Sequence, residues 1–150
     1  MRQFISGIIL INLRYDHLQL TKIFQEFIHD SDFNWSVKYG DNIINKQIKI
    51  LIELENKFEI LLPEKPPAVQ ETKVAPEAVT DQFIYLDKLY KGIQDSVDYH
   101  LRFVVETTRN DNLRQVFLDC YNEEVMIFNL TTTYGKTKGW THIPPSYITQ

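Results

Sequence analysis

The sequence predicts an all-α protein, a single four-helix bundle, and three observations support this prediction. The chain has 150 residues, the usual size of one domain, and 43% of them are hydrophobic, which is enough for a sizeable core. Apolar residues recur every three or four positions along most of the chain, which is the period of an α-helix. The longest interruption is a proline-rich stretch at residues 63–79. We therefore expect residues 1–150 to form one domain of two helical hairpins joined by a long connector.

The first hairpin is predicted to contain helices over residues 4–29 and 33–62. A short polar segment separates them, and Ser31 or Asp32 can cap the second helix, because such side chains accept hydrogen bonds from the free N–H groups of a first turn. The apolar stripe of the first helix is Leu10, Leu13, His17, Leu20, Phe24 and Phe27. That of the second helix is Val37, Ile44, Ile48, Leu51, Phe58 and Leu62.

The second hairpin is predicted to contain helices over residues 80–108 and 111–138. Thr80 or Asp81 can cap the third helix, and the break at residues 109–111 supplies the cap of the fourth. The stripe of the third helix is Phe83, Leu86, Tyr90, Ile93, Val97, His100 and Val104. That of the fourth is Leu113, Val116, Cys120, Glu123, Ile127, Leu130 and Tyr134. Gly139, followed by two prolines, ends this helix and begins a tail at residues 139–150.

The length of the connector predicts the topology. Helices of this size are about 40 Å long at 1.5 Å per residue. The connector, residues 63–79, reaches roughly 53 Å if its 17 residues are extended at 3.1 Å each. It can therefore cross the whole bundle, which favours an up-down-down-up order like that of ferritin-like folds. An up-down-up-down bundle with a loose loop is the alternative.

Composition and charge exclude several classes of function. The net charge is 16 − 20 = −4, whereas nucleic-acid-binding proteins typically carry a net positive charge. The apolar run at residues 4–13 is half the length of a membrane-spanning helix, so we expect no membrane span and a cytoplasmic protein. The single cysteine, Cys120, excludes a disulfide framework, and its place on a core stripe predicts an inert thiol.

No catalytic or cofactor-binding motif is found in the sequence. It lacks the Gly-x-Ser-x-Gly turn of many serine hydrolases, a phosphate-binding glycine loop and a dinucleotide fingerprint. The sequence leaves open whether the protein is an enzyme, but the missing motifs favour a non-enzymatic role. We predict no catalytic residues and no cofactor other than a metal ion.

Three short segments resemble one protein family. They are TDQF at residues 80–83, NLRQVF at residues 112–117, and KGW at residues 138–140 with PPSY at residues 144–147. In these segments the chain resembles an uncharacterised ferritin-like family of spore-forming Firmicutes that is related to spore coat protein F. The resemblance extends over residues 80–148, and in residues 1–62 it rests on helix lengths and on the proline-bearing joint.

The resemblance implies a ferritin-like bundle without an established activity. It also implies association with spores and with other coat proteins as partners. Tyrosine is enriched at subunit interfaces, and the third and fourth predicted helices carry five tyrosines, so we expect a homo-oligomer, most simply a dimer. The five are Tyr85, Tyr90, Tyr99, Tyr121 and Tyr134.

A ferritin-like bundle raises the question of a metal site. Di-iron proteins of this fold need a Glu from each of two helices and a Glu-x-x-His from each of the other two. The sequence contains one such motif, Glu26 to His29, at the end of the first predicted helix, which argues against an oxidase. Three polar residues near the bundle middle remain as candidate metal ligands: His17, Glu123 and Glu124.

Other interpretations of these residues stay open. His17 can instead donate a hydrogen bond to a buried carboxylate of the fourth helix, because a buried polar group needs a partner. A misplaced helix boundary would leave these groups in solvent. His100 lies about 9 Å from the midpoint of its predicted helix, at 1.5 Å per residue, so we do not expect it to share an ion with His17.

Two functions therefore compete at this point. The first is a structural or interaction protein, and the second is a bundle that binds a metal ion or small ligand around His17 and Glu123 or Glu124. A cavity with converging polar side chains would favour the second, and a tightly packed centre with an apolar dimer face the first. The tail either folds back onto the bundle, through Trp140, or binds a partner.

Overall fold

A computed structural model describes residues 2–68 and 79–141 of the chain, and these residues form helices and no strands. Helix α1 spans Arg2–Gln25, α2 spans Ser31–Lys57 and α5 spans Asp111–Lys138. Between α2 and α5, the elements α3 (Asp81–Phe83), η2 (Ile84–Tyr90) and α4 (Lys91–Glu106) follow one another as a single continuous helix, of which η2 is a π-helical stretch. The predicted all-α four-helix bundle is confirmed.

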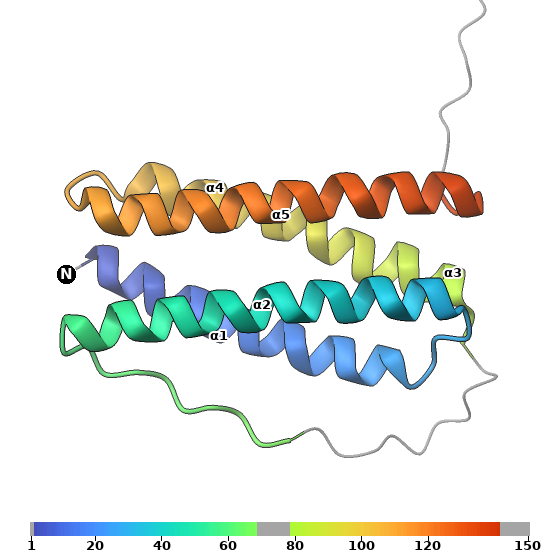
Figure 1. Cartoon of the computed structure of the whole chain (residues 1–150), viewed down its shortest axis with the longest axis horizontal. Helices are drawn as coiled ribbons and strands as arrows, with labels where there is room; N and C mark the ends of the chain where they lie inside the picture. Colours follow the sequence, from blue (N-terminus) through green and yellow to red (C-terminus); the bar gives the residue numbers. More distant parts are fainter. Residues whose placement is uncertain (1, 69–78, 142–150) are drawn as a thin grey trace, which may run out of the picture.

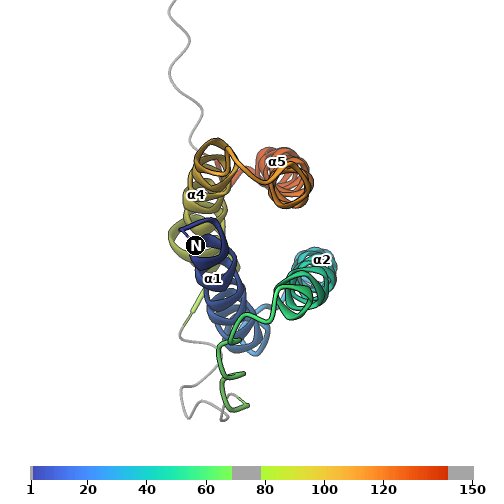
Figure 2. The same cartoon turned by 90° about the vertical axis from the view of Figure 1, so that its left-hand side faces the viewer.

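The helix directions follow the predicted up-down-down-up order. In Figure 1, α1 and α5 run from left to right, whereas α2 and the α3–α4 helix run from right to left. The chain that leaves α2 turns back along the outside of the bundle as far as residue 68, and residues 69–78 of the predicted connector lie outside the described residues. The end-on view in Figure 2 shows α4 above α1 and α5 above α2.

Short polar residues start three of the helices, as expected. Asp30 caps α2 and accepts from the Phe33 N–H at 2.8 Å, and Asn110 caps α5 and accepts from the Leu113 N–H at 3.0 Å. The cap of α2 is thus one residue earlier than predicted. Asp30 also accepts from Tyr134 Oη at 2.8 Å and from Lys138 Nζ at 2.6 Å. The start of α2 is therefore tied to the end of α5.

Three helices end earlier than the sequence pattern predicts: α1 ends at Gln25 rather than at residue 29, α2 at Lys57 rather than at residue 62, and α4 at Glu106 rather than at residue 108. Beyond α2, Glu59 adopts a left-handed conformation with φ of 56°, and the Ile60 N–H bonds back to the Glu55 carbonyl. Such a turn terminates a helix by satisfying its last carbonyl groups. Apolar periodicity continued past this point, but Leu61 is 90% exposed and adds nothing to the core.

The core consists of two large apolar clusters near opposite ends of the bundle. The first contains Leu10, Ile11, Leu51, Phe103, Leu113 and Phe117, and the second contains Phe27, Phe33, Val37, Ile84 and Tyr85. Trp140 packs against the second cluster, with its ring 5.5 Å from those of Phe33 and Tyr85. The beginning of the tail therefore folds back onto the bundle, while residues 142–150 lie outside the described residues.

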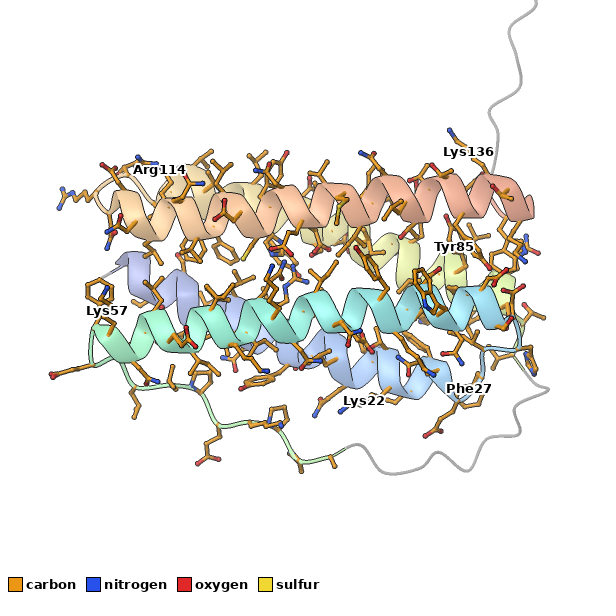
Figure 3. All side chains as sticks on the ribbon, in the orientation of Figure 1. Lys22, Phe27, Lys57, Tyr85, Arg114 and Lys136 are labelled. Atoms are coloured by element: carbon orange, nitrogen blue, oxygen red, sulfur yellow. The ribbon has the colours of Figure 1, made fainter. Side chains whose placement is uncertain are left out.

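Tyr85 anchors the second cluster. It is fully buried, and Figure 3 shows its ring directed into the bundle, whereas the nearby Lys136 points outward. Its hydroxyl donates to the Thr131 carbonyl at 2.7 Å, and burial raises its pKa to about 12. The ring lies directly against Gly135 of α5, where an added Cβ atom would be closer than van der Waals contact to the hydroxyl oxygen. The close contact between η2 and α5 thus requires glycine, which has no side chain, at position 135.

A lone buried carboxylate lies near the other end of the bundle. Glu55 of α2 is fully buried, and both of its carboxylate oxygens lack a hydrogen-bond partner among the described residues. It packs against Gly7 of α1, where an added Cβ would be closer than van der Waals contact to Oε1. Burial raises the pKa of Glu55 from its ordinary value of 4.5 to about 7.

We predict that Glu55 makes the bundle less stable as the pH rises from 4.5 to 7. The unfolded chain ionises this carboxyl near pH 4.5, whereas the folded chain keeps its proton until about pH 7. Over this interval the free energy of unfolding should fall by up to about 3 kcal/mol and then stay level. Glu55→Gln should remove this slope in urea titrations followed by circular dichroism. Glu53→Gln, an exposed neighbour, is the control, and an unchanged slope in Glu55→Gln would contradict the prediction.

None of the helices in the described part of the chain is both long enough and apolar enough to span a bilayer.

Candidate functional site

The middle of the bundle contains a buried arginine. Arg14 of α1 is 1% exposed, and its Nη2 donates to Glu124 Oε2 of α5 at 2.8 Å. The same nitrogen donates to Nε2 of His100 on α4, so that one guanidinium joins three helices. A buried ion pair of this kind requires good geometry, because removing two charges from water is costly.

His100 is held as a neutral imidazole. Its Nδ1 lies 2.7 Å from the carbonyl oxygen of Ser96, one turn earlier on α4. A carbonyl only accepts, so Nδ1 carries the proton and Nε2 is left to accept from Arg14. Burial and the neighbouring Arg14 charge lower the pKa of His100 to about 4. The ring is therefore uncharged at neutral pH, and its tautomer is set by Ser96.

Arg14 also lowers the pKa values of the other two ionisable groups, His17 and Glu124. His17 is half-buried, with Nδ1 3.4 Å from Arg14 Nη1, and burial together with the Arg14 charge lowers its pKa. Burial disfavours the ionised form of Glu124, but Arg14 outweighs this effect and the pKa of Glu124 lies below its ordinary value. At neutral pH the cluster thus holds one positive charge, one negative charge and two neutral imidazoles.

Of the predicted site residues, the structure brings His17 and Glu124 together around Arg14. Glu123 is half-buried and lies one position earlier on α5, a turn of about 100° around the helix. The predicted hydrogen bond from His17 to a buried carboxylate is replaced by the bond from Arg14 to Glu124. His100 was expected at a different level along the bundle axis from His17. Both residues nevertheless contact the guanidinium of Arg14, because this side chain is long enough to span the axial distance between them.

Arg14 itself was missed by the sequence reasoning. An arginine next to apolar residues is usually solvated, with only its stem buried. The available signal was its spacing: Arg14 lies four residues after Leu10 and three before His17, on the buried side of the first helix. That signal identifies a buried position but not the partner, which is 110 residues away in the chain.

A metal ion and Arg14 would compete for the same place. The guanidinium lies between His17, His100 and Glu124, and its fixed positive charge repels a cation. Within residues 2–68 and 79–141, no three His, Cys, Asp or Glu side chains are grouped so that they could hold a metal ion. A metal site at His17, Glu123 and Glu124 stays a prediction, and it requires Arg14 to move away.

A cavity of about 650 Å³ begins at this cluster and extends toward the second apolar cluster. Its walls come from α1, α2, η2, α4 and α5, and are mainly apolar: Phe24, Phe33, Val37, Ile44, Leu89 and Ile127. Arg14, His17 and Glu124 line one part of it. Helices α2 and α5 approach each other less closely than the two members of either hairpin, and exposed residues of both, Trp35, Tyr39 and Leu130, form the rim.

A second carboxylate lines the same cavity. Asp41 of α2 is half-buried, and its two oxygens accept from Thr21 Oγ1 and Gln25 Nε2 of α1, each at 2.7 Å. Burial raises the pKa of Asp41, although these hydrogen bonds and the exposed Lys22 act in the opposite direction. Asp41 forms no ion pair within the described part of the chain.

The cysteine next to this site, Cys120, is not an activated nucleophile. Cys120 is buried on α5, one turn before Glu124, and burial raises its pKa to about 12. The thiol therefore stays protonated, whereas a reactive cysteine needs the thiolate form. The nearby imidazoles have lowered pKa values, and His100 is bonded to Arg14 and Ser96.

Comparison with known proteins adds a likeness of fold. No family model and no curated protein matches the sequence. One solved structure, that of a candidate spore coat protein from Bacillus halodurans, is similar with a TM-score of 0.86 and 14% sequence identity. The similarity covers 98% of this chain and 94% of the Bacillus chain. At this identity the likeness extends to the fold alone.

Proposed function

We propose that this protein is a non-enzymatic binding bundle whose cavity takes a small molecule with a mainly apolar body. The observation that carries the proposal is the cavity itself, about 650 Å³ in volume, with apolar walls and the Arg14–Glu124 pair within it. Ligand sites typically have volumes of about 300–1,000 Å³ and combine apolar walls with a few fixed polar groups. The cavity meets both conditions, and its rim leaves an entrance between α2 and α5.

The polar cluster suits binding better than chemistry. Arg14 is fixed by Glu124 and His100, and the Cys120 thiol is held protonated, so nothing in the cluster is prepared to attack a substrate. Fixed groups of this kind orient a ligand without changing it. This proposal develops the small-ligand part of the predicted alternative, a metal- or small-ligand site around His17 and Glu123 or Glu124.

The proposal is tested with N-phenyl-1-naphthylamine, an apolar dye whose fluorescence rises when it leaves water. We expect one dye molecule per chain. Ile127→Phe, which fills part of the cavity, should weaken binding about tenfold, or about 1.4 kcal/mol. Ile50→Phe, the same exchange at an exposed position of α2 outside the cavity, should leave binding unchanged. Absence of stoichiometric binding, or equal effects of both variants, would refute the proposal.

A second candidate function is a structural or interaction role in the spore. Two observations favour it: the likeness of fold to a candidate spore coat protein, and the resemblance of residues 80–148 to a ferritin-like family related to spore coat protein F. In this case the protein would act as a homodimer, bind spore or coat proteins, and be cytoplasmic or associated with the spore. Native mass spectrometry of fresh protein tests it by reporting the oligomeric state and any bound metal together. A metal-free monomer would argue against both the dimer and the metal site at His17, Glu123 and Glu124.

A further inference from the structure

The charges that line the cavity differ in how they are compensated. Arg14 and Glu124 neutralise each other at 2.8 Å, and His17 is neutral at pH 7 because its pKa is lowered. The remaining charged residues of the lining are Asp41 and Lys88. Lys88, and Lys22 that acts on Asp41 from outside the lining, are exposed, so solvent screens both charges, whereas Asp41 is half-buried and forms no ion pair among the described residues. Because Arg14 is paired with Glu124, no buried cation of the lining is left to balance the charge of Asp41.

From this arrangement we infer that the ligand is an amine: an apolar body with one protonated nitrogen, which binds beside Asp41. The inference rests on the proposed function and names the ligand class for the same cavity. Each Asp41 oxygen accepts one hydrogen bond from α1, and a carboxylate has about four lone-pair sites, so acceptor capacity remains for an ammonium group. Thr21 and Gln25 also hold the carboxylate in place, which lowers the entropic cost of binding.

An anionic ligand fits the same cavity poorly. Its carboxylate would be attracted by Arg14, but it would meet Glu124, which is bonded to that arginine, and Asp41 on the wall between α1 and α2. The repulsion of an anionic ligand by two carboxylates, Glu124 and Asp41, thus outweighs its attraction to the single guanidinium of Arg14. A neutral alcohol avoids the repulsion but leaves the Asp41 charge without a partner. Charge-assisted hydrogen bonds are stronger than neutral ones, so the amine is favoured over both.

Three probes of equal chain length separate these classes: octylamine, 1-octanol and octanoate, each used to displace N-phenyl-1-naphthylamine at pH 8. At this pH the amine is protonated, as lysine is. We expect octylamine to bind about tenfold more tightly than octanol, the effect of one charge-assisted hydrogen bond, and octanoate to bind most weakly. Asp41→Asn should reduce octylamine binding to the level of octanol and leave octanol binding unchanged. Asp32→Asn, an exposed carboxylate of the same helix outside the cavity, should change neither.

The outcomes distinguish this inference from the proposed function. If octanol or octanoate binds as tightly as octylamine while the dye still binds, the amine assignment fails and the binding function stands. A preference for octylamine that survives Asp41→Asn likewise overturns the role of Asp41. If the dye does not bind at all, the proposed function fails, and the inference fails with it. Retained dye binding by Asp41→Asn shows that the variant is folded.

Discussion

Replacing Arg14 with methionine should destabilise the bundle by about 3–5 kcal/mol, because it leaves the Glu124 carboxylate buried without its partner. Both side chains are almost completely buried, so the Glu124 carboxylate loses its main compensating charge in a poorly solvated place. His100 also loses the donor to its Nε2. The free energy of unfolding is measured by urea titration at pH 7. Arg102→Met, an exposed arginine of α4, is the control and should change stability by no more than about 0.5 kcal/mol.

The double variant Arg14→Met/Glu124→Leu distinguishes a desolvated charge from simple loss of packing. Replacing both members of a buried ion pair with apolar residues of similar volume is often neutral or stabilising. We therefore expect the double variant to recover most of the stability lost in Arg14→Met. A double variant as unstable as the single one would show that the charge on Glu124 is not the source of the loss.

Gly135→Ala should destabilise the protein by about 2–4 kcal/mol, although alanine is the better helix former. The new Cβ would be closer than van der Waals contact to the Tyr85 hydroxyl oxygen and to Cζ, so the ring must move. Movement breaks the hydrogen bond from Tyr85 to the Thr131 carbonyl and disturbs the contact with Trp140. Thermal unfolding followed by near-ultraviolet circular dichroism reports both the stability and the tyrosine environment.

Gly92→Ala is the matched control, because a Cβ at this helical glycine of α4 has no atom within 4 Å. Here alanine should raise the stability by about 0.5–1 kcal/mol through its lower conformational entropy in the unfolded chain. The two glycine variants should therefore have opposite signs. If Gly135→Ala instead raised the stability, the Tyr85 ring would be able to move without lowering the free energy of unfolding, and the prediction would be wrong.

Much of the fold could be predicted from local patterns. The four helical regions, the polar residues that start three of them and the glycine that ends α5 depend on neighbours within four positions, and all are visible in the sequence. The length of the connector also indicated the crossover topology. The ends of α1 and α2 could not be predicted, because the apolar pattern runs beyond the last helical hydrogen bond.

The candidate site was predicted only in part. His17 and Glu124 were placed near the middle of the bundle from their positions along their helices, and both are there, but the arginine that binds them was not found. The sequence by itself determined the helices and their apolar faces, because these depend on hydrogen bonds and periodicity within a few residues. Only the tertiary structure decided that Arg14 is paired across 110 positions, that Asp41 has no ion pair among the described residues, and that a cavity lies between parts of α2 and α5. The reason is physical: charge compensation and empty volume depend on which side chains meet in space, and helical periodicity sets only the direction in which each one points.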